Sequence, residues 1–198
     1  RQDHGVTLAG VHTTECPELV FGLSVTGYGK GELLLRMSGM QAGDRLVLTK
    51  PVGTGAIFAG AMQGKTKGRW IAGAVASMLQ SNADAARLAR EHGATACTDV
   101  TGFGIAGHLY EMLRASGCDA ELDTGAIPLL DGFDELTGQD IVSTLDAPNR
   151  RRVSGVLGTA PELDKSRVAA LFDPQTAGGL LIAIPAERAE ALAKSLKT

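Results

Sequence analysis

The feature that most constrains this chain is an apolar run that ends in hydroxyl and carboxylate side chains and then in glycine. The run covers residues 94–97 and predicts a buried strand, and a helical pattern follows over residues 105–113. Between them stand Asp99, two threonines and two glycines. Glycine allows a sharp turn that brings backbone N–H groups close to a ligand, and the next helix directs its positive end at the same point. The arrangement suits a phosphate group or a phosphate-bound metal ion, although Asp99 could simply cap the helix.

The rest of the chain alternates between strand and helix patterns, which is typical of an α/β fold. Strands are expected at 20–26, 33–35, 45–49, 118–122, 168–172 and 180–184, and helices at 56–62, 70–79, 82–92 and 186–196. Short helices and loops are expected over residues 123–165. No linker between these segments is long enough to require two domains.

Composition supports such a fold and excludes several functions. The chain has 198 residues, 44% of them hydrophobic and 4% aromatic, with 26 glycines, a mix typical of small-residue α/β packing. The formal net charge is -3, and the basic run at 150–152 has no neighbouring aromatic residue, so nothing indicates a nucleic-acid surface. No apolar stretch approaches the ~20 residues that a membrane-spanning helix needs.

The cysteines indicate the redox compartment of the protein. Cys16, Cys97 and Cys118 are an odd number without C-x-x-C spacing, so they predict neither a zinc site nor a disulfide framework. Cys97 and Cys118 are expected to be buried and inert, and a reducing, cytoplasmic setting fits all three.

Because the chain starts at Arg1 rather than Met, we interpret it as a fragment of a longer polypeptide, unless processing removed the start.

Three loops are candidate ligand sites because each follows a strand end and combines glycine, threonine and a charged residue. They cover residues 50–55, 99–104 and 173–179, and ligands of α/β sheets gather outside the carboxyl ends of strands. None is a Walker A loop or a G-x-G-x-x-G fingerprint. The candidate phosphate-binding residues are Lys50, Thr101, Gly102, Gly104, Asp173 and Thr176. The alternatives are that Lys50 is a solvated side chain and that Asp173 only opens a turn.

Four strings in these segments, taken together, resemble one family. They are Thr49-Lys50-Pro51-Val52-Gly53-Thr54-Gly55, Ser81-Asn82, Thr98-Asp99-Val100-Thr101-Gly102-Phe103-Gly104 with Gly107-His108, and Asp173-Pro174-Gln175-Thr176-Ala177-Gly178-Gly179-Leu180-Leu181. Their order and spacing are similar to those of the selenophosphate synthetases (selenide, water dikinases). The resemblance implies a Mg²⁺-dependent transferase reaction in which ATP, selenide and water give selenophosphate, AMP and phosphate. It also implies a three-layer α/β/α C-terminal domain of the aminoimidazole ribonucleotide synthetase superfamily, with a mixed sheet.

The resemblance further implies how the chain is divided. Residues 1–20 are expected to be the remnant of a connection to a missing N-terminal ATP-binding domain, and residues 20–198 the C-terminal synthetase-like domain. The family's catalytic Cys or selenocysteine, a nearby Lys and most magnesium-binding aspartates lie in the missing half. We therefore expect no catalytic residue in this stretch, no activity from it alone, and a homodimer of the complete protein.

Five positions carry family roles by this resemblance. Asp99 corresponds to the one metal-binding aspartate of the C-terminal half. Gly10, Val11, His12 and Thr13 occupy the place of a Gly-Gly-His-Ser/Thr loop that reaches the nucleotide held by the neighbouring subunit. Val11 replaces the second glycine, and a β-branched residue does not easily take positive φ; by itself, His12 is more often a surface residue. The alternative function is a non-catalytic binding or regulatory module that keeps the fold.

The site assignment predicts an arrangement in space. The loops at 99–104 and 173–179 should be neighbours at one edge of the sheet, on a concave, exposed surface where the missing domain docks. Residues 10–13 should be mobile or displaced, because that domain would normally hold them.

Overall fold

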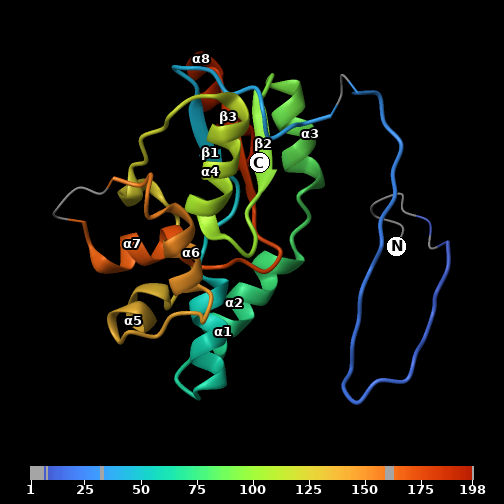
Figure 1. The fold of residues 1–198 in the computed structure, drawn as a ribbon, viewed down its shortest axis with the longest axis vertical. Coiled ribbons are helices and arrows are strands. Elements are labelled where there is room, and N and C mark those ends of the chain that lie inside the picture. The colour runs from blue at the N-terminus through green and yellow to red at the C-terminus, as the bar shows by residue number, and fades with distance from the viewer. Residues whose placement is uncertain (1–6, 8, 32–33, 159–162, 198) are drawn as a thin grey trace. The chain divides into compact units, whose positions relative to one another are not determined.

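The computed structural model describes residues 7, 9–31, 34–158 and 163–197 of the chain. The chain divides into two units, Arg1–Leu34 and Leu35–Thr198. In the first unit every described residue is exposed, and none lies in a strand or an α-helix (Figure 1).

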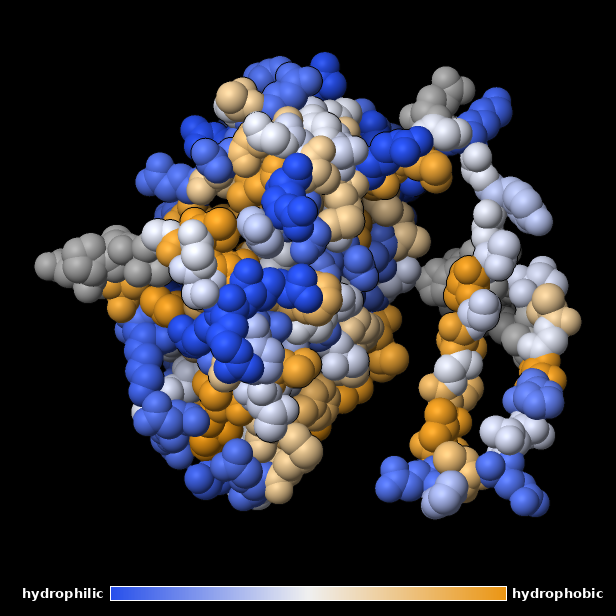
Figure 2. Space-filling view, viewed as in Figure 1, coloured by the Kyte–Doolittle hydropathy of each residue, from blue (hydrophilic) through white to orange (hydrophobic). Residues whose placement is uncertain are grey.

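The prediction of a strand at 20–26 is wrong, because the structure has no strand there. The alternating segment leaves its apolar side chains in solvent, where they stand out as orange atoms in Figure 2; they include Val20, Phe21, Leu23 and Val25. Its backbone finds no partner strand among the described residues, and an unpaired strand is not stable in water. The strand expected at 33–35 is likewise absent at its last two positions, and its first lies outside the described residues.

The second unit is organised around a three-stranded sheet in the order β1–β3–β2. The strands are β1 (Arg45–Leu48), β2 (Ala96–Asp99) and β3 (Leu180–Ile184). Each overlaps a strand predicted from the sequence. Both ladders are antiparallel, with Asp99 opposite Leu180. The expected mixing of strand directions is therefore not found in this sheet; in the described ranges a parallel pairing occurs as an isolated bridge between Val52 and Leu129.

Helices connect the strands and cover them. They are α1 (Thr54–Met62), α2 (Gly68–Leu79), α3 (Ala83–Glu91), α4 (Gly104–Ser116), the 3₁₀ helix η2 (Thr124–Ala126), α5 (Phe133–Gly138), α6 (Asp146–Val153), α7 (Lys165–Phe172) and α8 (Ala186–Ser195). The longer helices predicted from the sequence are confirmed as α1, α2, α3, α4 and α8. The short elements expected over 123–165 are confirmed as η2, α5 and α6.

Two further expected strands are absent. Residues 168–172 belong to helix α7, whose first N–H groups are capped by the Asp164 side chain and whose last residues are buried. A short apolar run does not by itself distinguish a strand from a buried helix. Residues 118–122 form no helix or strand; they follow Gly117, which ends α4 in the left-handed conformation with φ 69°, and they pair with no strand in the described part of the chain.

All five side chains of β3 are apolar and buried, and they point alternately to the two faces of the sheet. Leu180, Ile182 and Ile184 pack on one face with residues of α3 and α8. Leu181 and Ala183 pack on the other face with residues of α4 and α7. Because successive residues of a strand point to opposite faces, a strand buried along its whole length must lie between two helical layers. The result is the three-layer α/β/α arrangement that the resemblance implied (Figure 1).

Candidate functional site

The loops singled out in the sequence meet at one edge of the sheet. β1 and β2 both run antiparallel to β3, so the ends of β1 and β2 lie beside the start of β3. Val100 N–H donates to Gly179 O (2.9 Å), and Gln175 N–H donates to Thr101 O (3.0 Å). The prediction that the loops after β2 and before β3 are neighbours is confirmed.

Asp173 points into the protein rather than toward solvent. It is 3% exposed, and its carboxylate accepts the N–H groups of Gly55 (3.0 Å) and Ala56 (2.8 Å) at the start of α1. A carboxylate there satisfies N–H groups that have no partner within the helix, and it interacts favourably with the helix dipole. Burial raises the pKa of Asp173 to about 7, against the hydrogen bonds that lower it. Asp173 therefore caps α1 and does more than open a turn.

Gln175 is a structural residue whose role was not predicted from the sequence. Its Oε1 accepts the N–H groups of Gly53 (3.0 Å) and Thr54 (3.3 Å), and its Nε2 donates to the Asp173 carboxylate (2.9 Å). Thr54 Oγ1 accepts the N–H of Thr176 (3.0 Å), a residue that is itself exposed. The sequence signal was the start of α1, where the N-cap residue is a glycine without a capping side chain, so that a cap had to come from elsewhere.

Lys50 is buried rather than solvated. It is 4% exposed, and its Nζ donates to Gln80 O (2.6 Å) and Ala177 O (3.1 Å). Burial lowers the pKa of Lys50. Beside it, Asn82 Nδ2 donates to Gly178 O (2.9 Å). These bonds hold the loop before β3 against the C-terminal end of α2.

Asp99 is the exposed carboxylate of the site. It ends β2, and no residue of the described ranges makes a hydrogen bond or an ion pair with its side chain. The alternative that Asp99 caps the following helix is not what the structure shows, since the N-cap of α4 is Phe103. An exposed carboxylate without a partner is the kind of oxygen ligand that Mg²⁺ takes. Among the residues described, no cluster of three or more Asp, Glu, His or Cys able to hold a metal occurs.

Gly102 and Gly104 have different roles in the turn between β2 and α4. Gly104 has φ 68°, and a Cβ there would lie 2.8 Å from Leu171 O, so any other residue would be strained. Its N–H donates to Thr101 O (3.1 Å). The Gly102 carbonyl accepts from Asn149 Nδ2 (2.9 Å), while the space beside its Cα is open. Gly104 is therefore required by packing, and Gly102 leaves its side of the turn accessible.

The charge of Asp99 acts on two neighbours. Burial raises the pKa of Cys97 to about 11, and Asp99 adds to the shift, so Cys97 is the inert thiol expected from the sequence. Burial lowers the pKa of His108, and Asp99 opposes that shift.

The other two cysteines are less buried than Cys97: Cys118 is half-buried and Cys16 is exposed. All three cysteines are free.

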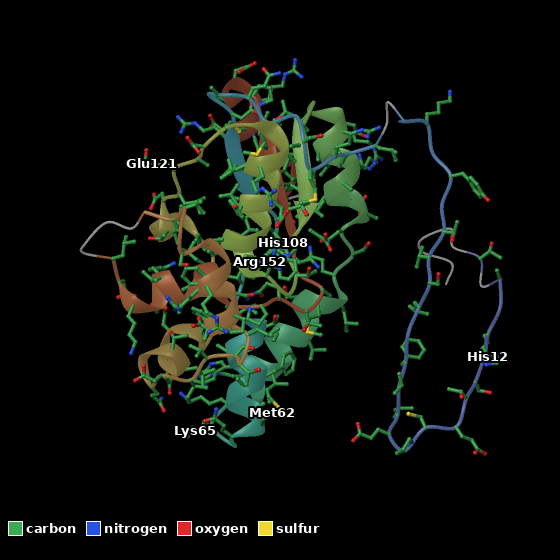
Figure 3. All side chains as sticks on the ribbon, viewed as in Figure 1. His12, Met62, Lys65, His108, Glu121 and Arg152 are labelled. Carbon is green, nitrogen blue, oxygen red and sulfur yellow. The ribbon has the colours of Figure 1, made fainter. Side chains whose placement is uncertain are left out.

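The expected nucleotide loop belongs to the first unit. Residues 10–13 are all exposed, and His12 is labelled on that segment in Figure 3. Val11 is 78% exposed, and its backbone does not take positive φ; among the described non-glycine residues Asp140 and Ala177 do. The role of residues 10–13, and their predicted displacement, stay predictions.

Two cavities of the second unit lie away from the three loops. One, of about 470 Å³, is lined by β1 and residues 118–123; the other, of about 930 Å³, is lined by α4 and residues 156–158. Neither is lined by Lys50, Asp99 or Asp173, so the concave surface expected at the site is not one of these two. Across the described ranges, no helix combines the length and the apolar character that crossing a membrane requires.

Comparison with known proteins gives this arrangement a context. Residues 41–198 match the family described as AIR synthase related protein, C-terminal domain. The chain is 38% identical, over 98% of its length, to a selenide, water dikinase of Caldanaerobacter subterraneus subsp. tengcongensis. It is 40% identical, over 96% of its length, to a protein of the same description from Nitratidesulfovibrio vulgaris strain Miyazaki F. The chain spans 56% and 55% of these two relatives, about half of each.

Two solved structures are similar in fold. Hydrogenase maturation protein HypE aligns over 82% of this chain and 42% of its own, with a TM-score of 0.54 and 21% identity. Thiamine-monophosphate kinase from Stenotrophomonas maltophilia K279a aligns over 82% of this chain and 46% of its own, with a TM-score of 0.52 and 18% identity. At these identities the likeness concerns the fold alone.

Proposed function

Because the chain belongs to the AIR synthase related protein family and carries its C-terminal domain, we propose that it is part of a selenide, water dikinase. Such an enzyme is an ATP-dependent phosphotransferase that makes selenophosphate from ATP, selenide and water. Identities of 38% and 40% to two proteins of that description, over nearly the whole chain, support the proposal.

The observation that carries the proposal is the contrast between two aspartates at one edge of the sheet. Asp173 is buried and caps α1, whereas Asp99 is exposed and its carboxylate makes no hydrogen bond or ion pair with any described residue. Of the two, Asp99 is the one that can bind a cation without breaking internal hydrogen bonds. We assign Asp99 as this domain's ligand for Mg²⁺, which when bound neutralises phosphate charge during phosphoryl transfer.

The turn after Asp99 is the part of this domain that we assign to phosphate binding. The residues assigned to it are Thr101, Gly102 and Gly104, with Thr176 on the neighbouring loop. The turn lies at the N-terminal end of α4, where the helix dipole favours an anion. Lys50 and Asp173 act indirectly in this proposal, because both have internal partners that hold the loop before β3 in place.

The other half of the site is assigned to the remainder of the protein. In this proposal residues 1–20 are the remnant of the connection to an N-terminal ATP-binding domain, and residues 20–198 form the C-terminal domain. Residues 10–13 contact the nucleotide held by the neighbouring subunit of a homodimer. The partners are then ATP and selenide, through the complete protein, in the cytoplasm.

A non-catalytic binding or regulatory module is the second candidate function. The observation in its favour is Val11, which stands where the related nucleotide loop has glycine and which does not adopt positive φ. A loop that has lost this glycine would hold a nucleotide less closely, while the three-layer domain would be unaffected.

Selenide-dependent formation of AMP from ATP and Mg²⁺ tests the proposal. The complete protein should form AMP when selenide is present, and the 198-residue chain alone should form none above background, because one carboxylate does not hold the metal. A folded complete protein that binds ATP and forms no AMP with selenide would favour the binding module. AMP formed by the chain alone would overturn the assignment of the remaining site to the other half.

A further inference from the structure

The side chain of His108 holds the turn that follows Asp99. His108 lies on α4 and is 8% exposed; its Nε2 accepts the N–H of Thr101 (3.0 Å) and is 3.2 Å from Thr101 Oγ1. A backbone N–H can only donate, so Nε2 carries no proton and the proton of the neutral imidazole is on Nδ1. The contact closes the turn onto the body of the helix.

Packing around the imidazole fixes its orientation. The Phe103 ring lies 5.3 Å from that of His108 and is tilted by 33° to it. The Arg152 guanidinium lies 3.8 Å from the centroid of the Phe103 ring and pairs with Glu111 (3.3 Å). Gly107 makes room for this stack, since a Cβ there would be 2.6 Å from Phe103 Cβ. Figure 3 shows His108 on α4 and Arg152 on α6 beside each other, so the imidazole cannot swing away without displacing its neighbours.

Two backbone hydrogen bonds that do not involve His108 also tie this turn to a second loop. Val100 N–H donates to Gly179 O (2.9 Å), and Thr101 O accepts from Gln175 N–H (3.0 Å). Both join the turn to the loop before β3. Loss of the His108 acceptor would therefore leave the strand and the loop in place, and it would free the N–H of Thr101, two residues after Asp99.

We propose that His108 is a positioning residue for the metal ligand Asp99. By accepting the Thr101 N–H it sets the path of the backbone after Asp99, and with it the direction of the Asp99 carboxylate toward a divalent cation. The proposal rests on the assignment of Asp99 as a Mg²⁺ ligand. Groups that orient a metal ligand in this way change metal affinity about 10- to 100-fold when they are removed.

Two amide variants separate the acceptor from the rest of the ring. Gln places its Oε1 near the position of Nε2, whereas Asn is one carbon shorter and does not reach the Thr101 N–H. In the complete protein, with Mn²⁺ as the probe and its free concentration read by EPR, the dissociation constant should rise about tenfold or more in His108→Asn and much less in His108→Gln. The matched control is His92→Asn: this partly buried histidine contacts the Ser195 hydroxyl (3.2 Å), and its variant should leave Mn²⁺ affinity unchanged.

A second readout follows the hydrogen bond itself. In the 198-residue chain the amide proton of Thr101 should shift upfield in His108→Asn and stay near its wild-type position in His108→Gln. Wild-type Mn²⁺ affinity in His108→Asn would overturn the proposal. So would failure of that variant to fold while His92→Asn folds, because the two backbone ties should suffice for folding. If Asp99→Asn also leaves Mn²⁺ affinity unchanged, the metal assignment fails, and the Thr101 resonance still decides whether His108 holds the turn.

Discussion

Asp173 and Ala56 are 117 residues apart in the sequence, yet the Asp173 carboxylate accepts the Ala56 N–H at 2.8 Å. This bond, with the neighbouring one from Gly55, makes the start of α1 depend on the loop that leads into β3. The loop at 173–179 has the composition of a ligand-binding loop, yet its first residue caps helix α1 inside the protein. Substitutions in it should change stability before they change binding.

Replacing Asp173 by Ala should destabilise the second unit. The change removes the cap of α1 and leaves buried N–H groups without a partner, which together should lower the free energy of unfolding by about 1–3 kcal/mol. Urea denaturation measures the difference. Asp119→Ala, at an exposed carboxylate, is the control and should stay within about 0.5 kcal/mol of wild type. Equal stabilities of the two variants would contradict the capping role.

The raised pKa of Asp173 predicts a pH dependence of stability. Its folded-state pKa of about 7 lies above the ordinary value of about 4, so between these pH values the folded state binds a proton that the unfolded state has lost. The stability from this group is full below about pH 4 and is lost as the pH rises through about 7. The free energy of unfolding of wild type should therefore fall, relative to that of Asp173→Asn, across this range. A constant or rising difference would show that the carboxylate is ionised throughout.

Gly104→Ala and Gly102→Ala should differ in stability although they are two residues apart. Gly104 has φ 68° and a close backbone neighbour at Leu171 O, so Ala should cost about 1–3 kcal/mol there. Gly102 has open space beside it, and Ala there should change stability by about 0.5 kcal/mol or less. Chemical denaturation of the two variants side by side makes the comparison. A tolerant Gly104 would mean that the turn relaxes away from α7.

Asp99→Asn in the complete protein should keep the fold and lose turnover. Asn is nearly isosteric with Asp, and the side chain is exposed, so the thermal midpoint should not move. Loss of one anionic metal ligand should lower kcat about 100-fold or more, if the cation supplies several kcal/mol of charge stabilisation. Steady-state kinetics over a range of Mg²⁺ concentrations measures the effect. Unchanged turnover would show that the Asp99 carboxylate is not a metal ligand.

Hydrophobic periodicity predicted the helices and strands whose formation depends mainly on their own sequence. The helical period over 186–196 and the apolar run at 180–184 were enough to place α8 and β3. The segment 20–26 alternates as a strand does, but a strand also needs a partner, and periodicity says nothing about partners. At 168–172 the apolar run fits either structure, and the capping aspartate at 164 was the signal that favoured a helix.

The residues of the site also differ in whether their surroundings could be predicted from the local sequence. Asp99 could be selected from its own segment, because its environment is set by the strand it ends and the turn it begins. The burial of Lys50 could not, because its partners Gln80 and Ala177 come from α2 and from the loop before β3. The roles of Asp173 and Gln175 likewise depend on contacts more than a hundred residues away, which no local pattern records.

The central strand of the sheet is the last to be made. β1 and β2 each pair with β3 and not with each other, and β3 (Leu180–Ile184) follows both of them in the sequence. On the ribosome, β1 must therefore wait for its partner on the order of ten seconds at ordinary rates of translation. During that interval its apolar residues are exposed to chaperones and to other nascent chains. A premature stop codon anywhere before β3 would give a product in which both earlier strands lack their partner strand.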